Sequence, residues 1–275
     1  MKTDTSTALH EFCSADTPET SASAGDVNSH EEFFRLYVAE LTGICPHDHA
    51  PLQLKLEHTF RVLENARFIA KEEHFLPLVT RACLLAALYH DISRFEQYRI
   101  WKTFRDHESC DHGELSVELV QRMNVMKKEP ELENCVLTAI RLHNKRTLPE
   151  KLSETEHTVC SVIRDADRID IMQIIDEHLS GKSGTSPDVI TPFPDNPNLF
   201  SQSVIKAVLE RKAASYADLK SVNDFRLLAA GWFYLMGFES SKRLTVQAGH
   251  ARSLIEHLPF PYEQVQLQLL NDLQC

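Results

Sequence analysis

A run of apolar residues that ends in an adjacent histidine and aspartate limits most strongly how this chain can fold. From Leu78 to Tyr89 only two side chains are polar, and His90 and Asp91 follow directly. A helix without a polar face belongs in the interior of a helical bundle. An imidazole and a carboxylate at the end of such a helix are costly to bury unless something pairs with them, and a metal ion would do so. The stretch therefore predicts that other helices bring further ligands to the same point.

Composition narrows the class of protein. The 275 residues are 43% hydrophobic and include only eight glycines, and few segments alternate Val, Ile or Thr with polar residues, which favours an all-α fold. The net charge of -11 argues against bulk nucleic-acid binding. Seven cysteines without a C-x-x-C pair indicate a reducing compartment. No apolar run is long enough for a membrane span and no secretory signal is visible, so we expect a cytoplasmic protein with no membrane partner.

The pattern along the chain predicts a disordered tail at residues 1–29 and a single all-α domain at 30–275 with a C-terminal helical extension. Residues 97–111 are expected to be a long connection that walls or covers a site, and residues 180–197 a second long loop. The expected helices span 29–42, 52–72, 77–89, 111–123, 131–143, a segment from 153 onward, and several segments between 201 and 275, including 225–238.

Four further residues of metal-binding type lie on the inner faces of predicted helices. His58 borders the apolar stripe of residues 52–72, and His112 and His143 fall in the first and last turns of their helices. Asp167 follows Ile163 by four residues and so faces inward, and its neighbour Asp165 points elsewhere. Each of these residues alone is typical of a core histidine or a surface ion pair. Together with His90 and Asp91 they predict a metal site in the bundle core, built by facing helices.

The ordered pattern His58, His90-Asp91 and Asp167 resembles the HD superfamily of metal-dependent phosphohydrolases. The segments 90–96, 111–113, 142–144 and 165–170 are similar to a bacterial branch of uncharacterised HD-domain proteins, and the resemblance covers about residues 50–245. That branch commonly has glycine where Ser93 stands, a small change that we expect the site to tolerate.

The resemblance implies an HD-domain helical bundle and a set of metal ligands. His58, His90, Asp91 and Asp167 correspond to the ligands of one metal, and an alanine before Asp167 favours it over Asp165. His112 and His143 match the extra histidines of members that hold a second metal, with Asp91 bridging the two. Imidazole and carboxylate ligands suit Mn, Fe, Co, Ni or Zn, with one or two ions per chain.

The implied reaction is attack of metal-bound hydroxide on phosphorus, which cleaves a phosphate mono- or diester. Asp91 and Arg94 are the expected catalytic residues, with Arg94 as the preferred phosphate ligand ahead of Lys145 and Arg168. An aromatic side chain of the 97–111 connection, Trp101 or Phe104, is a candidate to stack on a base. The expected partner is therefore a small phosphorylated substrate, with a nucleotide as one candidate, and a homodimer is a candidate assembly.

Three other interpretations remain open on the sequence. Some relatives of this fold are di-iron oxygenases with the same kind of ligand set. An HD fold can also act as a non-catalytic, nucleotide-binding regulatory module. A helical interaction protein is the third alternative, and it requires the inward-facing ligands to coincide by chance.

Overall fold

The computed structural model describes residues 27–44, 49–181 and 193–274. These segments contain helices and no strand, which confirms the all-α prediction, and none of their helices combines the length and apolarity needed to cross a lipid bilayer. The chain forms two compact units with a boundary between Ile163 and Arg164. The α-helices are α2 (Asn28–Ile44), α3 (His49–Glu72), α4 (Pro77–Tyr89), α5 (Ser93–Trp101), α6 (His112–Arg122), α7 (Glu133–Leu142), α8 (Glu154–Leu179), α9 (Gln202–Leu209), α10 (Val222–Gly231), α11 (Glu239–Ala248), α12 (His250–Ile255) and α13 (Glu263–Asp272).

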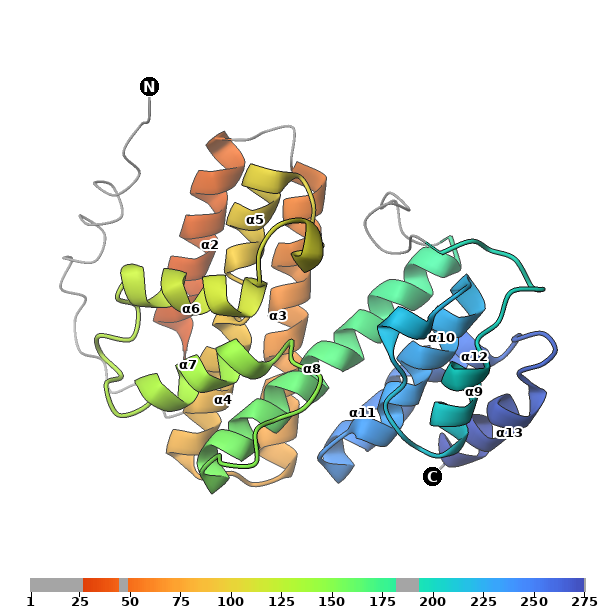
Figure 1. Ribbon diagram of the computed structural model, residues 1–275. Coiled ribbons are helices and arrows are strands. Elements are labelled where there is room, and N and C mark those ends of the chain that lie inside the picture. The colour runs from red at the N-terminus through yellow and green to blue at the C-terminus, as the bar shows by residue number, and fades with distance from the viewer. Residues whose placement is uncertain (1–26, 45–48, 182–192, 275) are drawn as a thin grey trace. The chain divides into compact units, whose positions relative to one another are not determined.

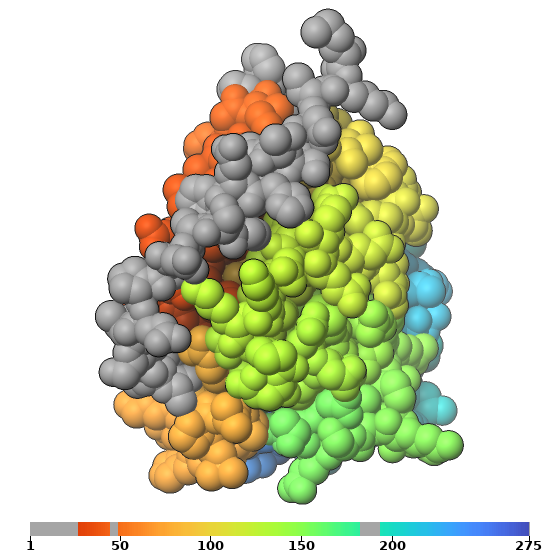
Figure 2. Space-filling model, turned by 90° about the vertical axis from the view of Figure 1, so that its left-hand side faces the viewer, coloured from red at the N-terminus to blue at the C-terminus, as the bar shows by residue number. Residues whose placement is uncertain are grey.

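Helix α4 is the central helix of the first unit, as its sequence predicts. Every residue from Ala82 to Tyr89 is buried, and α2, α3 and α7 pack against it. Pro77 begins the helix at a position where a missing N–H group does no harm. Figure 1 shows α6 and α7 crossing the direction of α3, and in Figure 2 these two helices form the middle of the visible face. The buried end of α4 thus lies where several helices converge.

Local capping signals fix the starts of α6 and α8. The Asp111 carboxylate accepts hydrogen bonds from the N–H groups of Gly113 and Glu114, at 3.0 and 3.3 Å. Ser153 and Glu156 form a reciprocal capping box: the Glu156 carboxylate accepts from the Ser153 N–H, and the Ser153 hydroxyl accepts from the Glu156 N–H. Both starts agree with the sequence. Because α6 begins one residue after Asp111, His112 is placed in its first turn, facing inward.

The connection expected at residues 97–111 is shorter than predicted. Helix α5 continues to Trp101, and a 3₁₀ turn, η2 (Asp106–Glu108), lies inside the remaining link. The charges of this stretch suggested an exposed loop, but Arg99 pairs with Glu96 one turn earlier on the same helix, at 2.6 Å. The expected wall is therefore mostly a helix.

Two other predicted boundaries moved. Helix α3 begins at His49, three residues earlier than expected. Val27 is buried and α2 begins at Asn28, so residues 27–29, which we assigned to the tail, belong to the folded part of the chain. Residues 1–26 of that tail and residues 182–192 of the second long loop lie outside the described residues.

The second unit has a core of its own, formed by residues of α8 to α13. The helix expected at 225–238 is instead α10, which ends at Gly231, followed by the 3₁₀ turn η5 (Trp232–Leu235). A Cβ atom on Gly231 would lie 2.9 Å from a methyl group of Val208, so glycine permits α9 and α10 to approach closely. The division from the first unit falls inside the continuous helix α8, where the sequence offers no linker signal. The single domain predicted for residues 30–275 stays a prediction.

Candidate metal centre

Five of the six predicted metal ligands come together in the first unit. His58 lies in the middle of α3, and His90 and Asp91 follow the last turn of α4. His112 is the first residue of α6, and His143 directly follows α7. All five side chains are buried, with at most 6% of any residue exposed. Their assignment as metal ligands stays a prediction, which the geometry below supports.

Asp91 stands between two groups of histidine nitrogens. Its Oδ2 atom lies 3.5 Å from His58 Nε2 and 3.7 Å from His90 Nε2. Its Oδ1 atom lies 3.5 Å from His112 Nε2 and 3.6 Å from His143 Nε2. One carboxylate therefore serves two trios, each with two imidazoles and one oxygen, and each trio is close enough to share one ion.

Three of the four imidazoles are oriented by acceptors at their Nδ1 atoms. His90 Nδ1 donates to the Ala87 carbonyl at 2.8 Å, and His143 Nδ1 donates to the Ile140 carbonyl at 2.7 Å. His112 Nδ1 donates to the Asp106 carboxylate. A carbonyl or ionised carboxylate can only accept, so in the neutral imidazoles the proton is on Nδ1 and the lone pair of Nε2 points into the cluster. Such support is what a histidine that binds a metal requires.

The atoms on the Oδ1 side of Asp91 form a group that a cation would complete. His112 Nε2 lies 2.9 Å from His143 Nε2. Burial, together with the Arg94 guanidinium, lowers the pKa of His112 to about 4, so this ring is neutral at pH 7. The His112 Nε2 lone pair points into the cluster, 3.3 Å from Arg94 Nη2, and the nearby Asp91 Oδ1, a buried atom, accepts no hydrogen bond from the described residues. The residues present therefore fit a divalent metal ion.

Asp91 is ionised at neutral pH. Burial alone would raise the pKa of this carboxyl, but Lys55, His90 and Arg94 hold it well below its usual range. Asp91 thus supplies the full negative charge that a metal ligand needs.

Two cations contact the Asp91 carboxylate. Lys55 Nζ lies 2.8 Å from Oδ2, and Arg94 Nε lies 3.4 Å from Oδ1. The other end of the Arg94 guanidinium is fixed by Gln97, by Asp106 and by the Phe104 carbonyl, at 2.6 to 2.9 Å. Arg94 therefore lies beside the cluster, as the sequence predicts, although only 13% of its side chain is exposed.

Sequence reasoning missed Lys55 and Asp106. Lys55 precedes His58 by three residues in the same helix, and this spacing could have indicated a shared face. Asp106 lies in the short turn η2, where no periodic pattern places a side chain. Its carboxylate binds both Arg94 and His112, and so connects the cation to the histidine.

Of the other candidates for phosphate or base contact, Lys145 and Phe104 have partners of their own. Lys145 forms an ion pair with Asp111. The Phe104 ring packs on Tyr98 with centroids 4.8 Å apart. Trp101, at the end of α5, is 41% exposed. Their roles at a substrate stay predictions, with weaker support than that of Arg94.

The sixth predicted ligand, Asp167, belongs to the second unit, and its role stays a prediction. It is half-buried on α8. The adjacent Asp165 is buried, and its carboxylate accepts a hydrogen bond from the Gly237 N–H at 2.8 Å. Burial raises the pKa of Asp165 to about 6. Asp165 therefore holds α8 to the segment before α11, in agreement with the preference for Asp167 as the ligand.

Ser93 fits the position where the similar sequences have glycine. Its hydroxyl donates to the His112 carbonyl at 2.8 Å and accepts from the Ser116 hydroxyl at 2.9 Å. The side chain is fully buried. Serine therefore joins the start of α5 to the start of α6, next to the second histidine trio.

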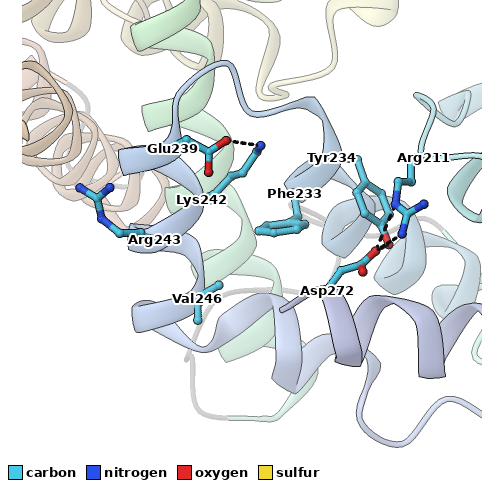
Figure 3. A pocket seen from close by; sticks show the side chains of 8 residues that line it. All are labelled: Arg211, Phe233, Tyr234, Glu239, Lys242, Arg243, Val246 and Asp272. Atoms are coloured by element: carbon cyan, nitrogen blue, oxygen red, sulfur yellow. Dashed lines mark hydrogen bonds and ion pairs between the residues drawn. The ribbon is translucent and has the colours of Figure 1, made fainter. Parts of the chain in front are cut away.

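A cavity of about 400 Å³ in the second unit has different chemistry. Figure 3 shows Arg211, Tyr234 and Asp272 on one side of it and Glu239 with Lys242 on the other. Asp272 pairs with Arg211 at 2.9 Å and Glu239 pairs with Lys242 at 2.6 Å, so both carboxylates have cationic partners. No histidine lines this cavity. It does not resemble the cluster around Asp91.

The segment that carries the cluster matches a known protein family. Residues 56–172 match the family model of the HD domain, a segment that contains all six predicted ligands. The match is shorter than the resemblance seen over residues 50–245. No curated protein and no solved structure matches the chain.

Proposed function

Since residues 56–172 form an HD domain and the protein is a member of the HD superfamily, we propose that it is a metal-dependent phosphohydrolase. The proposed substrate is a small phosphate mono- or diester, with a nucleotide-like molecule as the leading candidate. The family match supports this activity in general terms, and the substrate class is our extension of it.

One observation carries the proposal: on each side of an ionised Asp91, the Nε2 atoms of two buried histidines lie close to each other and to one carboxylate oxygen. The paired Nε2 atoms lie 2.9 Å apart on one side and 3.3 Å apart on the other, and cation binding at each trio explains both pairs. His58, His90 and Asp91 would hold the first ion. Asp91, His112 and His143 would hold the second. Bound divalent metal makes hydroxide available near neutral pH and neutralises phosphate oxygens.

The residues around the trios would position the substrate and the ligands. Arg94 presents a guanidinium to the same space as Asp91 Oδ1, where it would bind a phosphate oxygen with charge-assisted hydrogen bonds. Asp106 holds both Arg94 and His112, so ligand and phosphate-binding residue keep a fixed relation. Burial of the cluster excludes water and strengthens each of these charge interactions.

The test is metal content followed by hydrolysis. Protein purified without chelator is analysed by elemental mass spectrometry as wild type, Asp91→Ala, His143→Ala and a remote control, His257→Ala. We expect close to two transition metals per chain in the wild type and control, a loss of both in Asp91→Ala and of one in His143→Ala. The wild type should then hydrolyse p-nitrophenyl phosphate or its bis ester, and Asp91→Ala should not. A wild type that neither carries nor binds metal contradicts the proposal.

An oxygenase is the second candidate, because a carboxylate shared by two histidine-rich trios also suits two iron ions. Iron as the bound metal, oxygen uptake with an organic substrate, and no phosphatase activity would favour it. A protein that binds nucleotide and metal without turning either substrate over would instead be a regulatory module.

A further inference from the structure

Lys55 is a half-buried cation beside the first trio, where the binding of a metal alone does not call for a positive side chain. Its Nζ atom lies 2.8 Å from Asp91 Oδ2, and only 17% of its side chain is exposed. The same oxygen lies 3.5 Å from His58 Nε2 and 3.7 Å from His90 Nε2. An ammonium group in this place repels any cation that the first trio binds. It therefore weakens the metal site unless an anion also binds there.

Lys55 and Arg94 contact opposite oxygens of the same carboxylate. Lys55 approaches Oδ2 from α3, and Arg94 approaches Oδ1 from α5. Both also contact Phe104: the Lys55 ammonium lies 5.5 Å from the centre of its ring, and Arg94 donates to its carbonyl. The two cations thus lie on either side of Asp91, beneath the same residue of the α5–α6 link. An anion that enters here meets positive charge from two helices.

We propose that Lys55 binds the phosphate group of the substrate, as the partner of Arg94 on the other side of Asp91. This inference rests on the proposed phosphohydrolase function and assigns a second phosphate ligand to it. The ammonium supplies a charge-assisted hydrogen bond to a phosphate oxygen. Its repulsion of the metal is offset when the negatively charged phosphate is bound, so Lys55 favours metal and phosphate binding together.

A purely structural role for Lys55 makes the opposite predictions. If the ammonium served only to neutralise buried Asp91, its removal would leave Asp91 without its closest partner. Metal content and stability would then decrease, and the phosphate affinity of the remaining metal-loaded protein would not change. If Lys55 binds phosphate, its removal retains or tightens metal binding and weakens phosphate binding.

The experiment compares Lys55→Met, Lys55→Arg and Lys71→Met with the wild type, using full-length protein that retains the metal with which it is purified. Lys71 is exposed on the same helix, sixteen residues later, about 24 Å along the axis. Metal per chain is measured by elemental analysis, and inorganic phosphate is titrated by calorimetry. We expect Lys55→Met to keep its metal and to raise the Kd for phosphate about 10- to 100-fold. Lys55→Arg should recover most of the affinity, and Lys71→Met should match the wild type.

Each other outcome has a definite meaning. An unchanged phosphate Kd in Lys55→Met, or a loss of metal with unchanged phosphate affinity, overturns the role of Lys55 but leaves the proposed function standing if the wild type hydrolyses phosphate esters. A wild type that binds metal but neither binds phosphate nor hydrolyses esters overturns both. If Lys55→Met does not fold, Lys55→Gln takes its place, because its amide can still donate a hydrogen bond to Asp91 without the charge.

Discussion

Two buried aspartates, one in each unit, show how the same side chain can serve different purposes. Asp224 in the second unit is fully buried, and its Oδ1 accepts from the Ser201 N–H and the Tyr262 hydroxyl, each at 2.9 Å. Its Oδ2 accepts from the Lys220 N–H at 2.9 Å. Asp91 in the first unit is equally buried, but its Oδ1 accepts no hydrogen bond from the described residues.

The difference lies in the partners rather than in burial. Neutral N–H and O–H donors surround Asp224, so its charge is stabilised within the fold, as buried polar groups usually are. Four imidazoles and two cations surround Asp91, and Lys55 donates a hydrogen bond to its Oδ2 atom. The other oxygen, Oδ1, lacks a donor among the described residues but lies close to two imidazole nitrogens, which indicates that a cation from outside the chain completes the group. A buried carboxylate therefore predicts a metal site when one of its oxygens lacks a donor and histidine nitrogens surround it.

The largest loss of stability is expected when the Asp224 carboxylate is removed. Asp224→Ala leaves three donors without their acceptor, and we expect it to lower the free energy of unfolding by about 3 kcal/mol, since each lost hydrogen bond costs about 1 kcal/mol. Urea unfolding with and without bound metal measures it, with exposed Asp218→Ala as control. The loss should be the same in both conditions. If Asp224→Ala lowers the free energy of unfolding only when metal is bound, the distinction between Asp224 and Asp91 is wrong.

Removal of the metal tests the Asp91 side. A ligand that binds only the folded state stabilises it by about 2.7 kcal/mol at a free concentration of about 100 times its Kd. Chelator should therefore lower the Tm of the wild type and of Asp224→Asn. Asp91→Ala should have the same Tm with and without chelator. If chelator lowers the Tm of Asp91→Ala as much as that of the wild type, the metal binds elsewhere.

The helical bundle and the convergence of the candidate ligands could be predicted from sequence for a shared reason. The apolar run of α4 is buried because it has no polar face, and Asp111 caps α6 in a way that turns His112 inward. These are properties of backbone periodicity, and periodicity can be read along one segment. The sequence accordingly predicted that His58, His90, Asp91, His112 and His143 meet.

The missed features depend on side chains or on contacts between segments. Periodicity gives the direction of the Lys55 Cβ atom but not the position of an ammonium four bonds further out. Asp106 reaches His112 through a turn, and within α5 the charges of Arg99 and Glu96 pair one turn apart. The sharing of Asp91 between two trios depends on distances between four helices. None of these is encoded in a local pattern.

A smaller effect is expected from a substitution that removes the charge of Asp106 but keeps the shape of its side chain. Asp106→Asn keeps an oxygen that can accept from His112 Nδ1 but removes the negative charge that makes the ring a better ligand. We expect metal affinity at the trio of His112 and His143 to fall about 10- to 100-fold, with the trio of His58 and His90 unchanged. Competition titration with a chromophoric chelator resolves the two affinities. An equal loss at both trios would show that Asp106 stabilises the whole unit instead.

The smallest effect is expected for the hydrogen bonds of Ser93. They lie beside the trio of Asp91, His112 and His143, but like those of Asp224 they are satisfied within the fold. The Ser93 hydroxyl donates to the His112 carbonyl and accepts from Ser116, so its hydrogen-bonding capacity is met within the fold. Ser93→Ala should lower the free energy of unfolding by about 1 kcal/mol, with or without chelator. Metal content should stay at the wild-type value, because the His112 ring is oriented by Asp106 rather than by the backbone hydrogen bond. The contrary result is that Ser93→Ala loses one metal per chain. That result would show that distance from the cluster, and not the number of hydrogen-bond donors around a polar group, determines whether the group supports metal binding.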